Sequence, residues 1–438
     1  MNLLPLAFTG WSNLPGPAWL QEIVVKLLAA AALILPFVSV WAMFSIWLER
    51  KVAGRMQSRH GPMRVGGWHG WLQSLADGIK LIGKEDLMPA AADGVLFRLA
   101  PYLAFAPAFA AFLFLAWSRD LSGLTATMNA GVFFLLAVLG IEILGVILAG
   151  WGSNNKWSVY GAMREACQMV SYEIPLGLAI ICAVMVAGSL NMYEISLRQA
   201  GGYHTWLVFH DPFNFIAFIL YFVAALASCK RAPFDLPESE SELVAGYHTE
   251  YSGIRWSLFF FAEYAAMFVV AGIQTSLWLG AWYDPFGIVN YLEAHRFLAD
   301  GSVHWSYMVG ANVLGAAMFI GKSVLLVFVQ IWIRWTLPRL RIDQVLFMCI
   351  KVLLPVAMLN LLGAAIYLWL TDPASAGGGV NGNLVLFEQI MRVSLAAVGV
   401  LIVASLCAVV VWAWVGRSKS TFKVIYHSHS DIGSLPGA

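Results

Sequence analysis

Long uninterrupted runs of apolar residues constrain this chain more than any other feature of its sequence. The hydrocarbon core of a bilayer is about 30 Å thick, so a helix needs roughly 20 consecutive apolar residues to cross it. Nine stretches approach or exceed this length, and their continuous apolar character excludes the alternating pattern of a membrane β-barrel. The nine predicted spans cover residues 23–48, 99–117, 132–151, 174–190, 213–229, 254–279, 307–332, 352–370 and 393–415.

The sequence therefore predicts an all-α polytopic membrane protein, organised as a single integral membrane domain over residues 1–438. Only 12% of the residues are charged, whereas soluble proteins carry about 25%, which excludes a soluble fold. Twenty Lys and Arg residues fall on one side of the predicted spans and three on the other. The positive-inside rule therefore places the odd-numbered loops and the C-terminus in the cytoplasm, and the N-terminus outside.

This orientation requires an odd number of crossings, which agrees with nine predicted spans. The last of them, an extra C-terminal transmembrane helix over residues 389–416, follows a glycine-rich stretch and is predicted as an addition to the bundle. Residues 417–438 are predicted to form a cytoplasmic tail.

The sequence offers no conventional site for a redox cofactor. Its five cysteines are scattered, without the CxxC or Cys/His spacing that zinc and iron–sulfur sites need. It contains no GxGxxG or Walker-type loop, and a net charge of +1 argues against nucleic acid as a partner. We therefore expect no metal and no bound cofactor, so any electron carrier belongs to a partner. No basic segment precedes the first apolar run, so no removable signal peptide is expected.

The first cytoplasmic loop, residues 49–98, is predicted to contain an amphipathic helix. A helix lying in the membrane interface separates an apolar face from a polar face, and could frame an opening to the lipid. A solvated surface helix explains the same pattern. The apolar face is formed by Trp71, Leu72, Leu75, Ile79 and Ile82, and the polar face by Gln73, Asp77, Lys80 and Lys84.

A second cytoplasmic loop, residues 228–255, is rich in carboxylates and is called the acidic loop below. Crowded carboxylates raise one another's pKa, so some of them are expected to hold protons near neutral pH. An ordinary acidic loop explains the same composition, and the Ser239-x-x-Glu242 spacing also fits a helix capping box. The loop carboxylates are Asp235, Glu238, Glu240, Glu242 and Glu250.

Ionisable residues also occur within or at the ends of the predicted spans. A charge near the bilayer centre costs about 3 kcal/mol or more, so such residues usually face protein or water and mark a pathway. For Glu173, predicted at the start of its span, stabilisation by the helix dipole is an alternative. The set comprises Glu142, Glu173, Glu263 and Lys322, with Arg164, Glu165 and Tyr172 nearby. Together with the two loops, they suggest coupling of proton movement to an amphipathic ligand, and a quinone fits this description.

Six ordered motifs between residue 48 and about residue 355, some 70% of the chain, carry a family resemblance. They are LERKVAGRMQSRHGP with RVG, LQSLADGIKLIGKED, FRLAPYLAF, LAGWGSNNKWSVYGAMREACQMVSYEIPLGL, RAPFDLPESESELVAGYHTEYSG and LPRLRIDQVLFMCIKVLLP. On these motifs the sequence resembles the quinone-site membrane subunit of respiratory complex I, the proton-pumping NADH-quinone oxidoreductase.

The resemblance implies an eight-helix core in the bacterial inner membrane and quinone as the substrate. It implies partners in a peripheral arm that carries iron–sulfur clusters, and small and antiporter-like partners in the membrane arm. Quinone-binding residues are then expected at Glu49, Arg50, Gln57, Arg59, Phe234, Asp235 and Glu238. A proton pathway is expected at Arg164, Tyr172, Glu173, Glu240, Glu242 and Glu263, to which burial alone adds Glu142. A partner interface is expected at Arg64, Arg334, Arg339, Arg341 and Asp343.

The chain departs from the family pattern in the first loop, where GPMRVGGWHG introduces Met63, Gly67 and Trp68. His427 and His429 in the predicted tail extend beyond the family core and are expected to be solvated. Two other hypotheses remain open from the sequence. One is the equivalent subunit of a membrane-bound hydrogenase or another ferredoxin-linked relative. The other is an autonomous proton-coupled transporter, which the missing internal repeat disfavours.

Overall fold

The computed structural model describes residues 18–125, 128–296 and 304–371, together with residues 390, 393, 394 and 397, and all regular elements of this part are helical. Six of its helices are long and apolar enough to cross a membrane, and α9 (Pro212–Ser228) is a shorter apolar helix. The prediction of an all-α polytopic membrane protein is therefore confirmed. The six are α4 (Gly94–Phe112), α6 (Gly131–Gly152), α7 (Lys156–Ala187), α11 (Gly253–Trp278), α13 (Trp305–Thr336) and the continuous helix Ile342–Trp369.

That continuous helix consists of α14 (Ile342–Leu346), a π-helical segment η6 (Phe347–Leu353) and α15 (Leu354–Thr371). The first predicted span lies within α2 (Ala18–Met56). The predicted ninth span and the tail with His427 and His429 lie outside the described residues, apart from isolated helical positions near residue 393. The short elements are η2 (Trp68–Gly70), α3 (Gln73–Ile82), α5 (Arg119–Thr125), α8 (Met192–Arg198), η3 (Tyr203–Thr205), η4 (Leu207–Phe209), α10 (Glu240–Leu243), η5 (Gly246–His248) and α12 (Ile288–Ala294).

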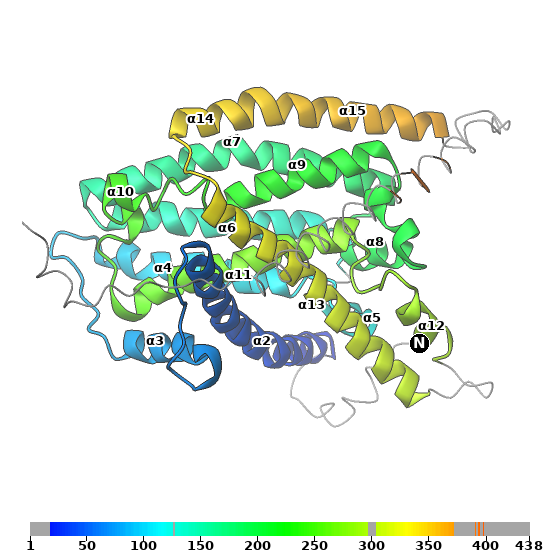
Figure 1. The fold of residues 1–438 in the computed structure, drawn as a ribbon, viewed down its shortest axis with the longest axis horizontal. Helices are drawn as coiled ribbons and strands as arrows, with labels where there is room; N and C mark the ends of the chain where they lie inside the picture. Colours follow the sequence, from blue (N-terminus) through cyan, green and yellow to red (C-terminus); the bar gives the residue numbers. More distant parts are fainter. Residues whose placement is uncertain are drawn as a thin grey trace, which may run out of the picture.

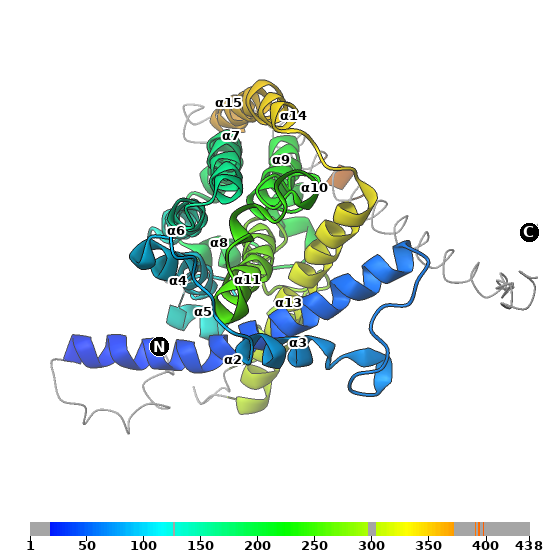
Figure 2. The same cartoon turned by 90° about the vertical axis from the view of Figure 1, so that its left-hand side faces the viewer.

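Helix α11 occupies the centre of the bundle, with α4 and α13 packed against it (Figures 1 and 2). In its most apolar stretch 72% of the residues are buried, against 28% in the helix Ile342–Trp369. The latter covers α7 and α9 from outside, and α6 lies between α4 and α7. Helix α2 bends along its length, as Figure 2 shows, and contains Pro36, which removes a helical hydrogen bond.

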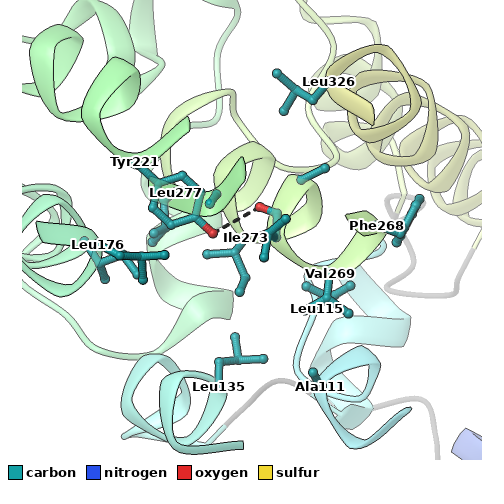
Figure 3. Close-up of a cluster of buried hydrophobic side chains, with 14 of the residues drawn as sticks. Ala111, Leu115, Leu135, Leu176, Tyr221, Phe268, Val269, Ile273, Leu277 and Leu326 are labelled. Carbon is teal, nitrogen blue, oxygen red and sulfur yellow. Dashed lines mark hydrogen bonds between the residues drawn. The ribbon is translucent and has the colours of Figure 1, made fainter. Parts of the chain in front are cut away.

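The core lies where α4, α6, α7, α9 and α13 meet α11 (Figure 3). Tyr221 of α9 reaches into it, and its hydroxyl donates a hydrogen bond to the Val270 carbonyl at 3.1 Å, as a buried phenol requires. Small residues permit the closest helix contacts, as is common in membrane bundles. At Gly145 of α6, an added Cβ would lie 2.5 Å from the backbone nitrogen of Ala104 in α4.

Several helix boundaries differ from those predicted by apolar run length. Helix α7 begins at Lys156, where the Asn155 side chain caps it by accepting from the Trp157 N–H at 3.0 Å. The prediction placed the start at residue 174 because the first half of the helix is polar. Helix α4 begins at Gly94, where the side chain of Asp93 caps it. Glu173 consequently lies in the interior of α7, so the alternative that a helix N-terminus stabilises it is wrong.

The amphipathic helix predicted in the first loop is present as α3. Its apolar residues point outward, with Ile79 63% and Ile82 71% exposed, while Asp77 on the polar face pairs with Arg50 of α2. The predicted location of α3 in the membrane interface stays a prediction.

Candidate functional site

A buried carboxylate near the end of α2 joins three parts of the chain. Glu49 is only 5% exposed, and its carboxylate accepts hydrogen bonds from Arg231 of the acidic loop at 2.9 and 3.2 Å. Arg334 of α13 forms a second ion pair with it, and the Tyr264 hydroxyl of α11 donates to it at 2.7 Å. The Arg231 guanidinium also lies 4.3 Å from the centre of the Tyr264 ring. A buried carboxylate needs such partners to stay ionised.

A second cluster, formed by Glu238, Tyr247, His248 and Glu263, lies between the acidic loop and α11. The Tyr247 hydroxyl lies 3.1 Å from Glu238 and 2.9 Å from Glu263, and His248 Nε2 lies 2.8 Å from Glu238. Arg231 approaches Glu263 at 3.9 Å, which links this cluster to Glu49. We call the four residues the carboxyl–tyrosine–histidine cluster.

This cluster is arranged to hold a proton. A phenol has one hydrogen, so Tyr247 can donate to only one of its two carboxyl neighbours, and the other must itself donate if both contacts are hydrogen bonds. Burial and the nearby Glu263 carboxylate raise the pKa of Glu238 to about 8. Burial alone would lower the pKa of His248, but the Glu238 carboxylate outweighs it and raises the pKa to about 9. Glu238 therefore changes its proton occupancy near neutral pH, as the crowding of carboxylates predicts.

Deeper in the bundle, Lys230 at the start of the acidic loop forms an ion pair with Glu142 of α6 at 3.1 Å, and both are buried. The Glu165 side chain of α7 is also fully buried. Glu173 is half-buried and faces Gly140 of α6, where an added Cβ would lie 3.6 Å from its Oε1 atom. Buried carboxylates thus continue from the acidic loop to α6 and α7.

The outer rim of the site is held by two further ion pairs. Arg339 pairs with Asp235 at 2.9 Å and donates to the Ser239 hydroxyl at 3.0 Å, while Arg164 pairs with Glu242 at 2.5 Å. Burial raises the pKa of Asp235, although Arg339 opposes the shift. Ser239 makes no side-chain cap on α10, so the capping-box interpretation of Glu242 is wrong. A surface pocket of about 400 Å³ lies beside this pair, lined by Trp157, Tyr160, Met163, Arg164, Cys167, Glu242, Leu243 and Ile342.

The other predicted residues are distributed over the surrounding structure. Phe234 is buried, whereas Arg50 pairs with Asp77 on the surface and Arg59 donates to Gln57 at 2.7 Å. Arg64, Arg341 and Asp343 are exposed, while Arg334 and Arg339 form ion pairs within the chain. Tyr172 is buried in α7, and the side chain of Glu240 lies outside the described structure.

Five residues at the centre of the site, Lys230, Arg231, Tyr247, His248 and Tyr264, were not among those predicted from the sequence. Lys230 and Arg231 come directly before the acidic run in the sequence, and two cations in that position are natural partners for it. One ligand atom from each of Glu238, His248 and Glu263 lies within 4.8 Å of the others, which is close enough to hold a metal ion. The direct contact between His248 and Glu238 at 2.8 Å favours an ion pair in this position.

These features define the class: a polytopic membrane protein whose buried charges are paired across helices beneath an acidic loop. A family model described as NADH dehydrogenase matches residues 28–365. The chain is 44% identical to the H subunit of NADH-quinone oxidoreductase from Chlorobaculum tepidum over 344 residues, 78% of this chain and 92% of the relative. It is 38% identical to the corresponding protein of Anaeromyxobacter dehalogenans over 403 residues, 89% of this chain and 95% of the relative.

The chain therefore belongs to the family of the H subunit of NADH-quinone oxidoreductase, a membrane subunit of complex I. The resemblance drawn from the six motifs is confirmed. Membership as a subunit of this oxidoreductase also disfavours the hypothesis of an autonomous transporter.

Proposed function

We propose that this chain forms the passage by which a quinone reaches its reduction site, and that its buried carboxyl groups couple the reduction to proton translocation. The observation that supports this most directly is the continuous set of contacts from Glu49 through Arg231 and Glu263 to Glu238 and His248. These contacts join the acidic loop to α2 and α11. A change of charge on a docked quinone would reach the carboxyl–tyrosine–histidine cluster through them.

The reduction of the quinone requires electrons, which a neighbouring subunit supplies. A quinone takes up two electrons and two protons to become a quinol, and its oxygens carry negative charge until the protons arrive. Arg231 and Arg334 stabilise negative charge nearby, and Glu238 can hold or release a proton near neutral pH. The residues of this chain orient the quinone, exclude water from it and exchange protons with it. The electron transfer itself belongs to a partner.

The proposal includes the orientation and surroundings of the subunit. Its acidic loop faces the cytoplasm, beside peripheral subunits with iron–sulfur clusters, and α6 and α7 face small and antiporter-like membrane subunits. The chain crosses the bacterial plasma membrane nine times, with eight helices as the core and the ninth as an addition. The exposed apolar residues of α3, such as Ile79 and Ile82, support its location in the membrane interface.

The test is a pair of substitutions in the assembled complex, Glu238→Gln and Glu263→Gln. Glutamine keeps the shape of each side chain but cannot take up a proton, so both quinone reduction and the proton gradient in inverted membrane vesicles should fall together. General acid–base groups contribute about 10²-fold or more to rate, which sets the scale of the expected loss. Glu250→Gln is the matched control, because Glu250 belongs to the same loop but binds Asn155 outside the cluster.

Wild-type quinone reduction and wild-type pumping in both variants would refute the proposed role of the cluster. Substitution of Glu242, which pairs with Arg164 at the rim, tests the outer part of the path in the same assay. Co-purification in mild detergent tests the partners. Iron–sulfur and antiporter-like subunits are expected, whereas a nickel–iron hydrogenase subunit would favour the related ferredoxin-linked complex.

A further inference from the structure

Two buried side chains that were not predicted as site residues, Glu165 and Lys230, lie where α6, α7 and α9 come together. Lys230 lies two residues beyond the end of α9, Glu165 is in the first half of α7, and Glu142 of α6, which faces both of them, completes the group. The Gln168 side chain of α7 donates to the Ala227 carbonyl of α9 at 2.8 Å, which fixes these helix ends together.

If both carboxyl groups were ionised, the charges in this group would not balance, because Lys230 is its one cation among the three residues. The Lys230 ammonium lies 3.1 Å from Glu142, and these two residues are 3% and 4% exposed. Glu165 is 0% exposed, and within the described part of the chain neither of its carboxyl oxygens has a hydrogen-bond partner. An ionised carboxylate without a hydrogen bond is strongly disfavoured in such a site, so Glu165 is neutral when Glu142 is ionised.

Lys230 itself remains charged. Burial disfavours its ammonium form, but the carboxylates of Glu142, Glu165 and Glu263 outweigh burial and raise its pKa above the ordinary value. Four other titratable groups face these two carboxyls: Tyr172 of α7, Cys229 after α9, Tyr247 of the acidic loop and Glu263 of α11. Glu263 has its own cation, since Arg231 approaches it at 3.9 Å. One permanent cation therefore serves two carboxyl groups of the bundle, and it can balance only one of them at a time.

We propose that Glu142, Glu165 and Lys230 form a proton-storing triad, in which Lys230 balances one carboxylate while the other carboxyl group holds a proton. This inference rests on the proposed function, and it assigns Lys230 as a positioning residue and Glu165 as a storage group. When the proton moves between the carboxyls, one O–H bond breaks and leaves its electron pair on oxygen, and an O–H bond forms on the other. Lys230 keeps its three N–H bonds and its charge throughout.

The first test replaces Glu165 by Gln in the complete complex. Infrared difference spectra between the quinone-oxidised and quinone-reduced states should lose one C=O band of a protonated carboxylic acid. Proton pumping per electron should fall while quinone reduction continues, because the electron path is untouched. Glu194→Gln is the control, since Glu194 is exposed and binds only Ser189 among the described residues. An unchanged spectrum and an unchanged pumping ratio in Glu165→Gln would overturn the triad.

A second test does not depend on the stability of that variant. Lys230→Met leaves Glu142 without its cation and should reduce the amount of assembled subunit, whereas the double variant Lys230→Met with Glu142→Gln should restore it. If the double variant assembles no better than the single one, Lys230 does not serve Glu142 and the triad is wrong. Loss of pumping in Glu263→Gln together with normal behaviour of Glu165→Gln would refute the triad alone. Normal pumping in Glu263→Gln and Glu238→Gln would refute the proposed function instead.

Discussion

Glu49 illustrates how single residues decide the stability of buried charge in this protein. Its carboxylate is surrounded by two guanidiniums and a phenol that come from the acidic loop, α13 and α11. Asp77, in contrast, pairs with Arg50 where both side chains are partly exposed to solvent. Both are pairs of a carboxylate with arginine, and the sequence does not distinguish them. The buried pair contributes more to the stability of the fold than the surface pair does.

Glu49→Gln is therefore expected to destabilise the subunit strongly, because the buried Arg231 would keep its charge with only the more distant Glu263 carboxylate, 3.9 Å away, and the partly exposed Arg334 would lose its ion pair. Breaking a buried ion pair by removing one partner costs about 3–5 kcal/mol. The thermal midpoint of the purified complex, followed by dissociation of this subunit, measures the effect. Asp77→Asn is the control, with an expected change of about 0–1 kcal/mol for a surface pair. Equal shifts in the two variants would contradict this account.

At the scale of whole elements, glycines decide how closely the helices approach. Gly145 lies where α6 meets the backbone of α4, whereas Gly177 of α7 has open space around the position of an added Cβ. Both are apolar helix residues in the sequence, and only their neighbours distinguish them. Helix α6 also carries Glu142, the partner of Lys230, so a displacement of α6 from α4 would bear on the site.

Gly145→Ala should lower the amount of correctly assembled subunit, because its methyl group would lie 2.5 Å from the Ala104 nitrogen and force the two helices apart. Overpacking of this kind costs about 1–3 kcal/mol. Quantitative immunoblotting of membranes, with thermal stability of the purified complex, provides the measurement. Gly177→Ala is the matched control and should assemble as the wild type does. Normal assembly of Gly145→Ala would show that α4 and α6 can separate at no cost.

At the scale of the whole molecule, the carboxyl–tyrosine–histidine cluster links folding to pH. The pKa of His248 is raised to about 9, so its contribution to stability is complete below its ordinary pKa and is lost as the pH rises through 9. The pKa of Glu238 is raised to about 8, so its neutral form is favoured in the folded state and its contribution disappears as the pH rises through 8. Both pKa shifts therefore make the folded state less stable as the pH rises.

The complex should therefore become less stable between pH 6.5 and pH 9, the interval between the ordinary and the raised pKa of His248. His248→Gln removes the histidine contribution and should flatten this dependence, although it also lowers stability at the acidic end. Thermal midpoints of wild type and variant across the interval provide the comparison. Parallel curves for the two proteins would show that His248 does not titrate with folding.

Much of the architecture was accessible from the sequence, but its helix boundaries were only partly so. The spans predicted at residues 132–151, 213–229 and 254–279 agree closely with α6, α9 and α11. The start of α7 was missed by 18 residues because its first half is polar, and contacts such as the Arg164–Glu242 ion pair and the Asn155 cap are not registered by hydropathy. A hydropathy profile measures how readily a segment transfers from water to lipid. It does not identify a polar helical segment that is stabilised by contacts with another part of the protein.

Apolar run length, charge distribution and motif order were sufficient for the membrane class, the family and most of the candidate carboxylates, because each depends on local composition or on short spacing. The pairing of charges was decided only when the helices packed. Glu49 and Arg231 are separated by 182 positions in the chain, and Lys230 and Glu142 by 88, so no local pattern could join them. These residues form close ion pairs because they are buried, and a charge removed from water needs a partner within the protein.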